Sequence, residues 1–451
     1  MRPDLFGDRT RIFQYFVRRR VMFFFLLLAV VLMVPIGQNI AAGELMIRGE
    51  ESYYHLVKAQ EAQWYEAQYL PLTWTLKILP EKGLIFLLFV MTFASLAMYF
   101  ILERRLKIEP SASSCFLFFL ILSPAFIAAY GTLSTAAFFT FLILCGFFFL
   151  TSRKKMRFLA ILPFSLAVLF EIFYFMLTIS LIAAYLHRRK ERFKKEKDWS
   201  VFFVPLVIII LFTIALMGHE PPLMLGPFDN EGGFTNIISD FGSSGGISFL
   251  VLLLAFVGAM IAGKHPLLYS SYFFLLFVIL AYVVNGRVLF FLSLLLIFFA
   301  TRGFITLFEW RWNFSTLKKF TAWLLLLGVL FSFTTFLDRF NSLPPSAEEK
   351  STLLWIEDHT SKKEIVFSMK ENEYFIRYFA KRSVVSDPKI LAATYINELF
   401  PLLEENNISI IYITKDMRRK LTEEQGFLFL LKNERFKLAH ASKEAEVWLF
   451  R

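Results

Sequence analysis

The sequence has few charged residues and few cysteines. Only 19% of its 451 residues are Asp, Glu, Lys or Arg, whereas soluble domains carry about 25%. Its two cysteines, Cys115 and Cys145, both lie inside apolar runs, which excludes a disulfide framework and a cysteine-based metal centre. Glycine is scarce late in the chain, where Gly426 is the only one after residue 338. A glycine-rich phosphate-binding loop is therefore excluded there.

Apolar residues take the place of the missing charge. They make up 57% of the chain and include 57 Phe, and runs of about 18 or more recur up to residue 337, long enough to cross about 30 Å of hydrocarbon. We therefore predict a polytopic α-helical membrane domain over residues 1–337. Over residues 338–451, short β-branched runs such as Ile408–Thr414 alternate with helical patterns such as Ala347–His359, which predicts a small α/β domain.

The net charge of +11 divides along the chain in a way that indicates topology. Six tracts hold 25 Lys and Arg against 8 Asp and Glu, the loops between them hold 5 against 11, and residues 338–451 hold 18 of each. The six tracts are 1–20, 103–112, 151–157, 187–199, 263–265 and 302–319. Because basic residues gather on the cytoplasmic side of a cell membrane, we predict a cytoplasmic N-terminus and an extracytoplasmic C-terminal domain. The basic residues are then expected to lie next to the lipid bilayer, and no nucleic-acid partner is predicted.

The number of spans depends on residues 158–186. Both flanks of this stretch are basic, and a single crossing would place one basic cluster outside. Two short helices that meet near Glu171 keep both clusters inside, which gives eleven spans. Glu171 lies among phenylalanines, where an ionised carboxylate costs at least about 2.5–3.5 kcal/mol, so it must lie at a helix end, be paired or be protonated.

Charged residues on the outer side are candidates for chemistry. Glu50 and Glu51 follow the first apolar run, and paired carboxylates can act as a general base or hold a cation; ordinary solvated loop charges are the alternative. Asp240 lies in a later outer loop, residues 218–246. Arg287 stands between two apolar runs, where a guanidinium either snorkels to the interface or holds a lipid phosphate.

Three stretches resemble the type C membrane glycosyltransferases (the GT-C class), nearest to the catalytic subunits of oligosaccharyltransferases. "GEESYYHL" at 49–56 is similar to the family's acidic element after the first span, "NGRVLFFLSLLLIFFATRGF" at 285–304 to its arginine-led penultimate span, and residues 353–387 to its segment after the membrane. The resemblance implies that Glu51 occupies the position of the catalytic acid, that His55 is the histidine trailing it, and that Arg287 binds the lipid-linked donor. "IISD" at 237–240 implies that Asp240 stands for the family's late outer-loop acid.

The chain departs from that family at two motifs. The family's WWDYG motif recognises the acceptor sequon, but the corresponding residues 368–374 here read SMKENEY. The second acidic motif of the family would fall near residues 128–135, which contain no acid. The resemblance therefore implies neither a protein sequon as the acceptor nor a full metal site.

The sequence predicts an inverting glycosyltransferase that moves a sugar or glycan from a polyprenyl phosphate or pyrophosphate to an acceptor on the extracytoplasmic face. Glu51, ahead of Glu50, would take the acceptor proton while Arg287 stabilises the leaving phosphate, and His55 and Asp240 would lie near the acceptor. A transporter or a non-catalytic scaffold that binds lipid-linked glycan is the alternative; the chain shows no internal repeat, which favours the enzyme. The sequence specifies no cofactor, and the alternative is a weakly held Mg²⁺ or Mn²⁺.

Overall fold

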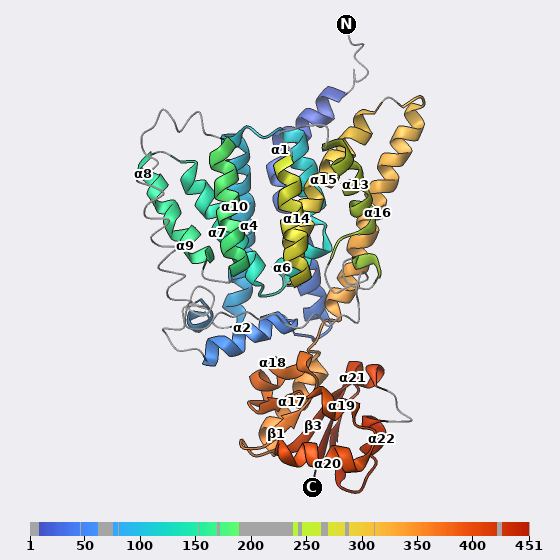
Figure 1. Cartoon of the computed structure of the whole chain (residues 1–451). Coiled ribbons are helices and arrows are strands. Elements are labelled where there is room, and N and C mark those ends of the chain that lie inside the picture. Colours follow the sequence, from blue (N-terminus) through green and yellow to red (C-terminus); the bar gives the residue numbers. More distant parts are fainter. Residues whose placement is uncertain are drawn as a thin grey trace. The chain divides into compact units, whose positions relative to one another are not determined.

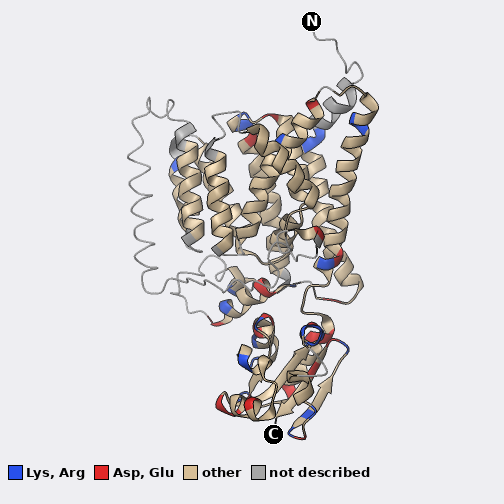
Figure 2. Ribbon diagram, turned by 45° about the vertical axis from the view of Figure 1, so that its right-hand side comes forward, with Lys and Arg blue, Asp and Glu red and all other residues tan. Residues whose placement is uncertain are grey.

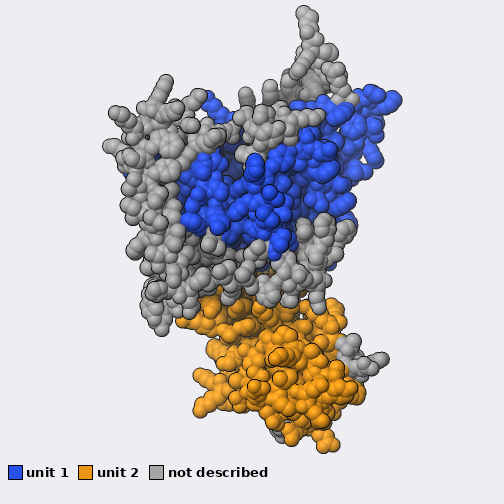
Figure 3. Space-filling model, in the orientation of Figure 1, with its two compact units in different colours: residues 1–36, 63–341 blue, residues 37–62, 342–451 orange. Residues whose placement is uncertain are grey.

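The computed structural model describes residues 9–45, 47–61, 75–79, 81–152, 154–168, 172–188, 238–241, 246–262, 269–284, 288–310, 312–421 and 426–450. The chain divides into two compact units, which Figure 3 colours separately. Unit 1 comprises residues 1–36 and 63–341, and unit 2 comprises residues 37–62 and 342–451. Unit 2 is therefore assembled from two separate pieces of the chain.

Unit 1 is built from helices. Their bounds are α1 Arg9–Ala41 (which runs on into unit 2), α4 Glu81–Leu106, α5 Pro110–Ile121, α6 Pro124–Gly131, α7 Thr135–Leu150, α8 Lys154–Arg157, η2 Phe158–Ala160, α9 Ile161–Val168, α10 Ile172–Arg188, η4 Ser239–Phe241, α13 Phe249–Ala262, α14 Tyr269–Val284, α15 Leu289–Glu309 and α16 Ser315–Asn341. Figure 1 shows α10 and α14 running in nearly the same direction, and α4 packs against α7. Helix α15 is central to the packing, since it contacts α5, α6, α13 and α14.

Several of these helices can cross a membrane. Four are long and apolar enough among the described residues, namely Arg19–Ala41, Gly83–Leu106, Leu289–Glu309 and Ser315–Asn341, and the pair α5 and α6, bent by 65°, would add a fifth. Charged residues gather towards the ends of the helices of unit 1 and leave the middle almost clear (Figure 2). The chain is thus a multi-pass membrane protein. The four or five spans found among the described residues do not confirm the predicted count of eleven.

Close packing in unit 1 depends on aromatic rings and on two glycines. The rings of Phe139, Tyr174 and Phe291 lie within 5.8 Å of one another, centroid to centroid. A Cβ atom on Gly258 of α13 would lie 1.8 Å from the carbonyl oxygen of Phe299, and one on Gly303 of α15 would lie 2.2 Å from that of Leu254. Glycine therefore lets the backbones of α13 and α15 touch.

The stretch around Glu171 forms two helices, as predicted. Helix α9 ends at Val168 and α10 begins at Ile172, and the two helices contact each other. Glu171 itself lies outside the described residues.

Unit 2 contains the predicted α/β domain, and helix α2 belongs to it as well. Its elements are α2 Glu50–Glu61, α17 Ala347–His359, β1 Ile365–Phe367, η7 Lys370–Asn372, α18 Glu373–Phe375, η8 Ile376–Ala380, β2 Ser383–Val385, α19 Pro388–Ala392, α20 Ile396–Glu405, β3 Ile408–Thr414, α21 Lys415–Lys420, α22 Phe427–Leu430, β4 Phe436–Ala441 and β5 Ala445–Phe450. The five strands are ordered β2-β1-β3-β5-β4. Strand β1 pairs in parallel with β2 and β3, and β5 pairs antiparallel with β3 and β4.

Candidate functional site

The two candidate carboxylates lie at the start of helix α2. Gly49 has a φ of 86°, a conformation that glycine adopts without strain, and its N–H donates to the carbonyl of Pro344 at 2.8 Å. Glu50 and Glu51 then occupy the first helical turn, where the helix dipole favours negative charge. The buried hydroxyl of Ser52 donates to the carbonyl of Arg48 at 2.7 Å. Hydrogen bonds to backbone carbonyls, one of them in the segment before α17, therefore fix the start of α2.

Arg48 anchors this turn to the rest of unit 2. Its side chain is only 4% exposed and its Nη2 lies 3.2 Å from Oε2 of Glu44, while Nη1 donates to the carbonyl of Leu343 at 3.4 Å. The same Oε2 of Glu44 accepts the N–H of Ala347, the first residue of α17, at 2.8 Å. Burial lowers the pKa of Arg48, and the Glu44 carboxylate opposes that shift. Neither Glu44 nor Arg48 was predicted from the sequence. The available signal was an acid and a base four positions apart.

Aromatic rings hold the next turn of α2. The ring of Tyr53 packs edge-on against Phe375 and Tyr378 at centroid distances of 5.3 Å, and its hydroxyl donates to the carbonyl of Ile47 at 3.1 Å. The ring of Tyr54 lies 5.0 Å from that of Tyr374. Residue 374 ends the stretch SMKENEY, so the acidic element and the stretch in place of WWDYG meet in one unit.

Glu51 and His55 form the candidate proton-transfer pair. Oε1 of Glu51 lies 3.7 Å from Nε2 of His55, and the Glu51 side chain is 31% exposed while that of His55 is 3% exposed. Nε2 of His55 has no hydrogen-bond partner among the residues that the structure describes. Glu50 is exposed and precedes this pair by one position. A solvent-accessible carboxylate beside a buried imidazole can accept a proton, and the assignment of this role to Glu51 stays a prediction.

Asp240 occupies a different setting, in unit 1. Its Oδ2 accepts the N–H of Phe249, the first residue of α13, at 2.7 Å, and its Oδ1 accepts the hydroxyl of Ser332 on α16 at 2.6 Å. Arg339 of α16 donates to the carbonyl of the neighbouring Ser239. Asp240 therefore caps α13 and ties it to α16, a role that its position before an apolar run was able to signal. Its predicted place near the acceptor is not tested by these contacts.

The remaining candidates are not placed by the structure. Arg287 lies outside the described residues, as does most of the outer loop 218–246. No group of three or more His, Cys, Asp or Glu side chains in the described part of the chain comes together closely enough to hold a metal ion. No chemical step below is routed through a Mg²⁺ or Mn²⁺ ion, whose involvement stays a prediction.

The sequence matches no protein-family model and no curated protein, but its fold is shared with solved structures. The chain is similar to the oligosaccharyltransferase of Archaeoglobus fulgidus tethered to an acceptor peptide with an NVT sequon, with a TM-score of 0.59 and 11% identity over 98% of this chain and 74% of that one. The complex of the Archaeoglobus fulgidus oligosaccharyltransferase AglB with an inhibitory peptide and a dolichol-phosphate gives 0.51 and 10% identity, over 90% of this chain and 70% of that one. ArnT from Cupriavidus metallidurans bound to undecaprenyl phosphate gives 0.51 and 11%, over 95% of this chain and 97% of that one.

Proposed function

We propose, from the fold that this chain shares with the GT-C membrane glycosyltransferases, that it transfers a sugar or glycan from a polyprenyl phosphate or pyrophosphate to an acceptor on the extracytoplasmic face. The observation that carries the proposal is the likeness over 95% of this chain and 97% of ArnT, whose structure holds undecaprenyl phosphate. The likeness to an oligosaccharyltransferase bound to dolichol-phosphate supports the same donor class. Fold alone does not carry activity, so the proposal also needs residues suited to the reaction.

Glu51 supplies the base in this proposal. The acceptor attacks the anomeric carbon from the face opposite the lipid phosphate, its proton passes to Glu51, and the bond from the anomeric carbon to the phosphate oxygen breaks with inversion. The exposed fraction of Glu51 and the buried imidazole 3.7 Å away support this role. Arg287 stabilises the charge that develops on the leaving phosphate, since guanidinium–phosphate bonds are strong and charge-assisted.

Binding of undecaprenyl phosphate to the purified chain tests the donor class. We expect Arg287→Lys to weaken binding by about tenfold or more, because the fork geometry of the guanidinium is lost although the charge is kept. Arg302→Lys is the matched control, since Arg302 is an exposed cation on α15 in a tract predicted to be cytoplasmic. Unchanged affinity in Arg287→Ala would leave only the snorkelling interpretation of Arg287.

The proposed topology has eleven spans, with the N-terminus in the cytoplasm and unit 2 outside. The excess of basic residues in the six tracts supports this orientation. A cysteine at the exposed Ser351 of α17 is expected to react with a membrane-impermeant thiol reagent in intact cells. Reaction only after lysis would reverse the orientation.

A further inference from the structure

An apolar cavity of about 260 Å³ lies in unit 1 between helices α1, α5, α15 and α16. Its apolar lining is Leu326 together with five phenylalanines, namely Phe23, Phe24, Phe118, Phe119 and Phe304. Three of the four helices are candidate membrane spans and α5 belongs to the bent pair. The cavity is therefore suited to hydrocarbon rather than to a polar solute.

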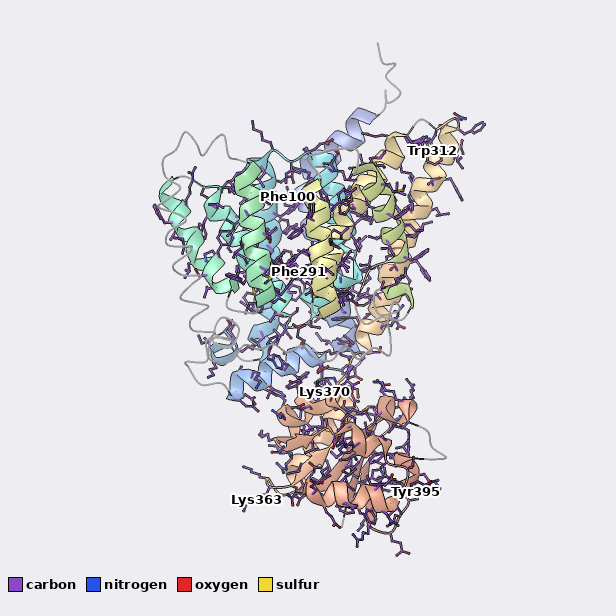
Figure 4. The ribbon with its side chains drawn as sticks, in the orientation of Figure 1. Phe100, Phe291, Trp312, Lys363, Lys370 and Tyr395 are labelled. Atoms are coloured by element: carbon purple, nitrogen blue, oxygen red, sulfur yellow. The ribbon has the colours of Figure 1, made fainter. Side chains whose placement is uncertain are left out.

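One part of the lining is polar, and it includes the guanidinium of a buried ion pair. Arg20, Ser114 and Cys115 complete the lining. The side chain of Arg20 is 12% exposed, and its Nη2 lies 2.5 Å from Oε1 of Glu103, which is 2% exposed. The guanidinium also lies over the ring of Phe100, labelled in Figure 4, at 5.7 Å. Arg20 is thus held in place beside the cavity.

Arg20 keeps donors that these contacts do not use. A guanidinium has five N–H donors, and the hydrogen bonds of Arg20 to described residues are those to Glu103 and, at 3.3 Å, to the carbonyl of Pro110. Glu103 has a second partner, because its Oε2 accepts a hydrogen bond from the hydroxyl of Ser113 at 2.7 Å. The remaining donors of Arg20 can therefore serve an anion at the cavity.

We infer that this cavity binds one hydrocarbon chain of a phosphate-bearing lipid, whose phosphate accepts hydrogen bonds from Arg20. The phenylalanine lining supplies the apolar contact, and Arg20 supplies the charge-assisted bonds that favour a phosphate over an uncharged head group. Arg287 precedes α15 in the sequence, whereas Phe304, which lines the cavity, lies 15 residues after Leu289, the first residue of that helix. The site is therefore separate from the donor position proposed at Arg287, and it is independent of the proposed function.

The two native cysteines allow a test without altering the chain. Cys115 lines the cavity, whereas Cys145 lies elsewhere, with its Sγ 3.5 Å from Sδ of Met98. We measure alkylation of both thiols by N-ethylmaleimide in the purified, detergent-solubilised chain, with phosphatidylglycerol, undecaprenyl phosphate or diacylglycerol added. At least one phosphate-bearing lipid is expected to slow the reaction of Cys115 about tenfold and to leave Cys145 unchanged, since hydrogen bonds to a charged group contribute about that much. Protection by phosphatidylglycerol identifies bulk phospholipid as the occupant, and protection by undecaprenyl phosphate alone identifies the polyprenyl carrier.

Further variants then separate the contribution of the hydrocarbon chain from that of the phosphate. Leu326→Trp fills the cavity and is expected to abolish protection, while Leu327→Trp, at a side chain that is 59% exposed on the same helix, is expected to retain it. The double variant Arg20→Gln, Glu103→Gln removes the charge without leaving a buried carboxylate unpaired, and it is expected to lose the preference for phosphate. Equal protection of Cys115 by diacylglycerol and by the phosphate-bearing lipids, or no protection by any lipid, would overturn the inference. Both results come from the unmodified protein, so they hold even if a variant fails to fold.

Discussion

The two acids that the sequence placed on the outer side, Glu51 and Asp240, lie in different units and in opposite settings. Asp240 accepts hydrogen bonds on both carboxylate oxygens at 2.6 and 2.7 Å, whereas Glu51 keeps 31% of its side chain exposed and faces an imidazole at 3.7 Å. A carboxylate that satisfies a helix terminus serves the fold, because moving it leaves the helix N–H and the buried hydroxyl of Ser332 without their partner. A carboxylate that keeps its solvent contact can exchange a proton. The comparison therefore favours Glu51 for chemistry and Asp240 for architecture.

The largest expected effect comes from removing the proton acceptor. Glu51→Gln keeps the shape of the side chain, and we expect single-turnover transfer to fall by about 10² to 10⁴, the usual cost of losing a general base. Donor binding is expected to survive, because Glu51 does not contact the phosphate in this mechanism.

Glu50→Gln is the matched control, and it should transfer at close to the rate of the unmodified chain. Loss of transfer in Glu50→Gln with full activity in Glu51→Gln would show that the acidic element is aligned one residue off. Full activity in both variants would remove this helix turn from catalysis.

Asp240→Ala is expected to act on stability more than on rate. Alanine removes both acceptor oxygens, so the hydroxyl of the buried Ser332 and the N–H of Phe249 lose their partner, and one unsatisfied buried donor costs about 1–3 kcal/mol. The thermal unfolding midpoint in detergent should fall, while transfer per folded molecule changes less than about tenfold. Ser332→Ala removes one donor only and should cost less. A rate loss of about a hundredfold at unchanged midpoint would place Asp240 in the reaction, with a cost typical of catalytic groups.

The smallest expected effect concerns Glu349 of unit 2, a carboxylate that has no role in the proposed reaction. Burial raises the pKa of Glu349, and the nearby carboxylates of Asp416 and Glu444 raise it further. Because its pKa is higher in the folded chain, the protonated form favours folding, so its stabilisation is complete at low pH and is lost as the pH rises above 4.5, the ordinary value. Glu349→Gln should therefore flatten this pH dependence, measured as hydrogen-exchange protection of the β3 amides in the full chain. Asp358→Asn, at an exposed site on the same helix, should leave it unchanged.

Local elements of the fold were predictable because their signals are local. The helix predicted at Ala347–His359 and the strand predicted at Ile408–Thr414 appear with the same bounds. The helix begins at a capping box between Ser346 and Glu349, and the strand is a continuous run of mostly β-branched, buried residues. The structure therefore confirms the helix and the strand, in each of which local propensity and burial favour the same secondary structure.

The assembly of the candidate site was not predictable in the same way. The membership of helix α2 in unit 2 depends on Arg48 reaching Leu343 and on Tyr53 meeting Phe375, which are contacts between segments about 300 residues apart. No spacing rule encodes such contacts, because they join segments that are distant in the sequence. The difference between Glu51 and Asp240 has the same origin, since hydrogen-bond partners such as Ser332 are distant in sequence.

Transfer from a lipid-linked donor in a reconstituted system tests the central claim most directly. The purified chain in lipid nanodiscs is supplied with radiolabelled lipid-linked sugars and an acceptor extract, both from cells that make this protein. We expect label to leave the lipid fraction and appear on an acceptor, with release of an equivalent amount of polyprenyl phosphate or pyrophosphate. Label that stays bound to the chain, or that crosses the bilayer of a liposome with its glycosyl–phosphate bond intact, would contradict the account and identify a scaffold or a transporter.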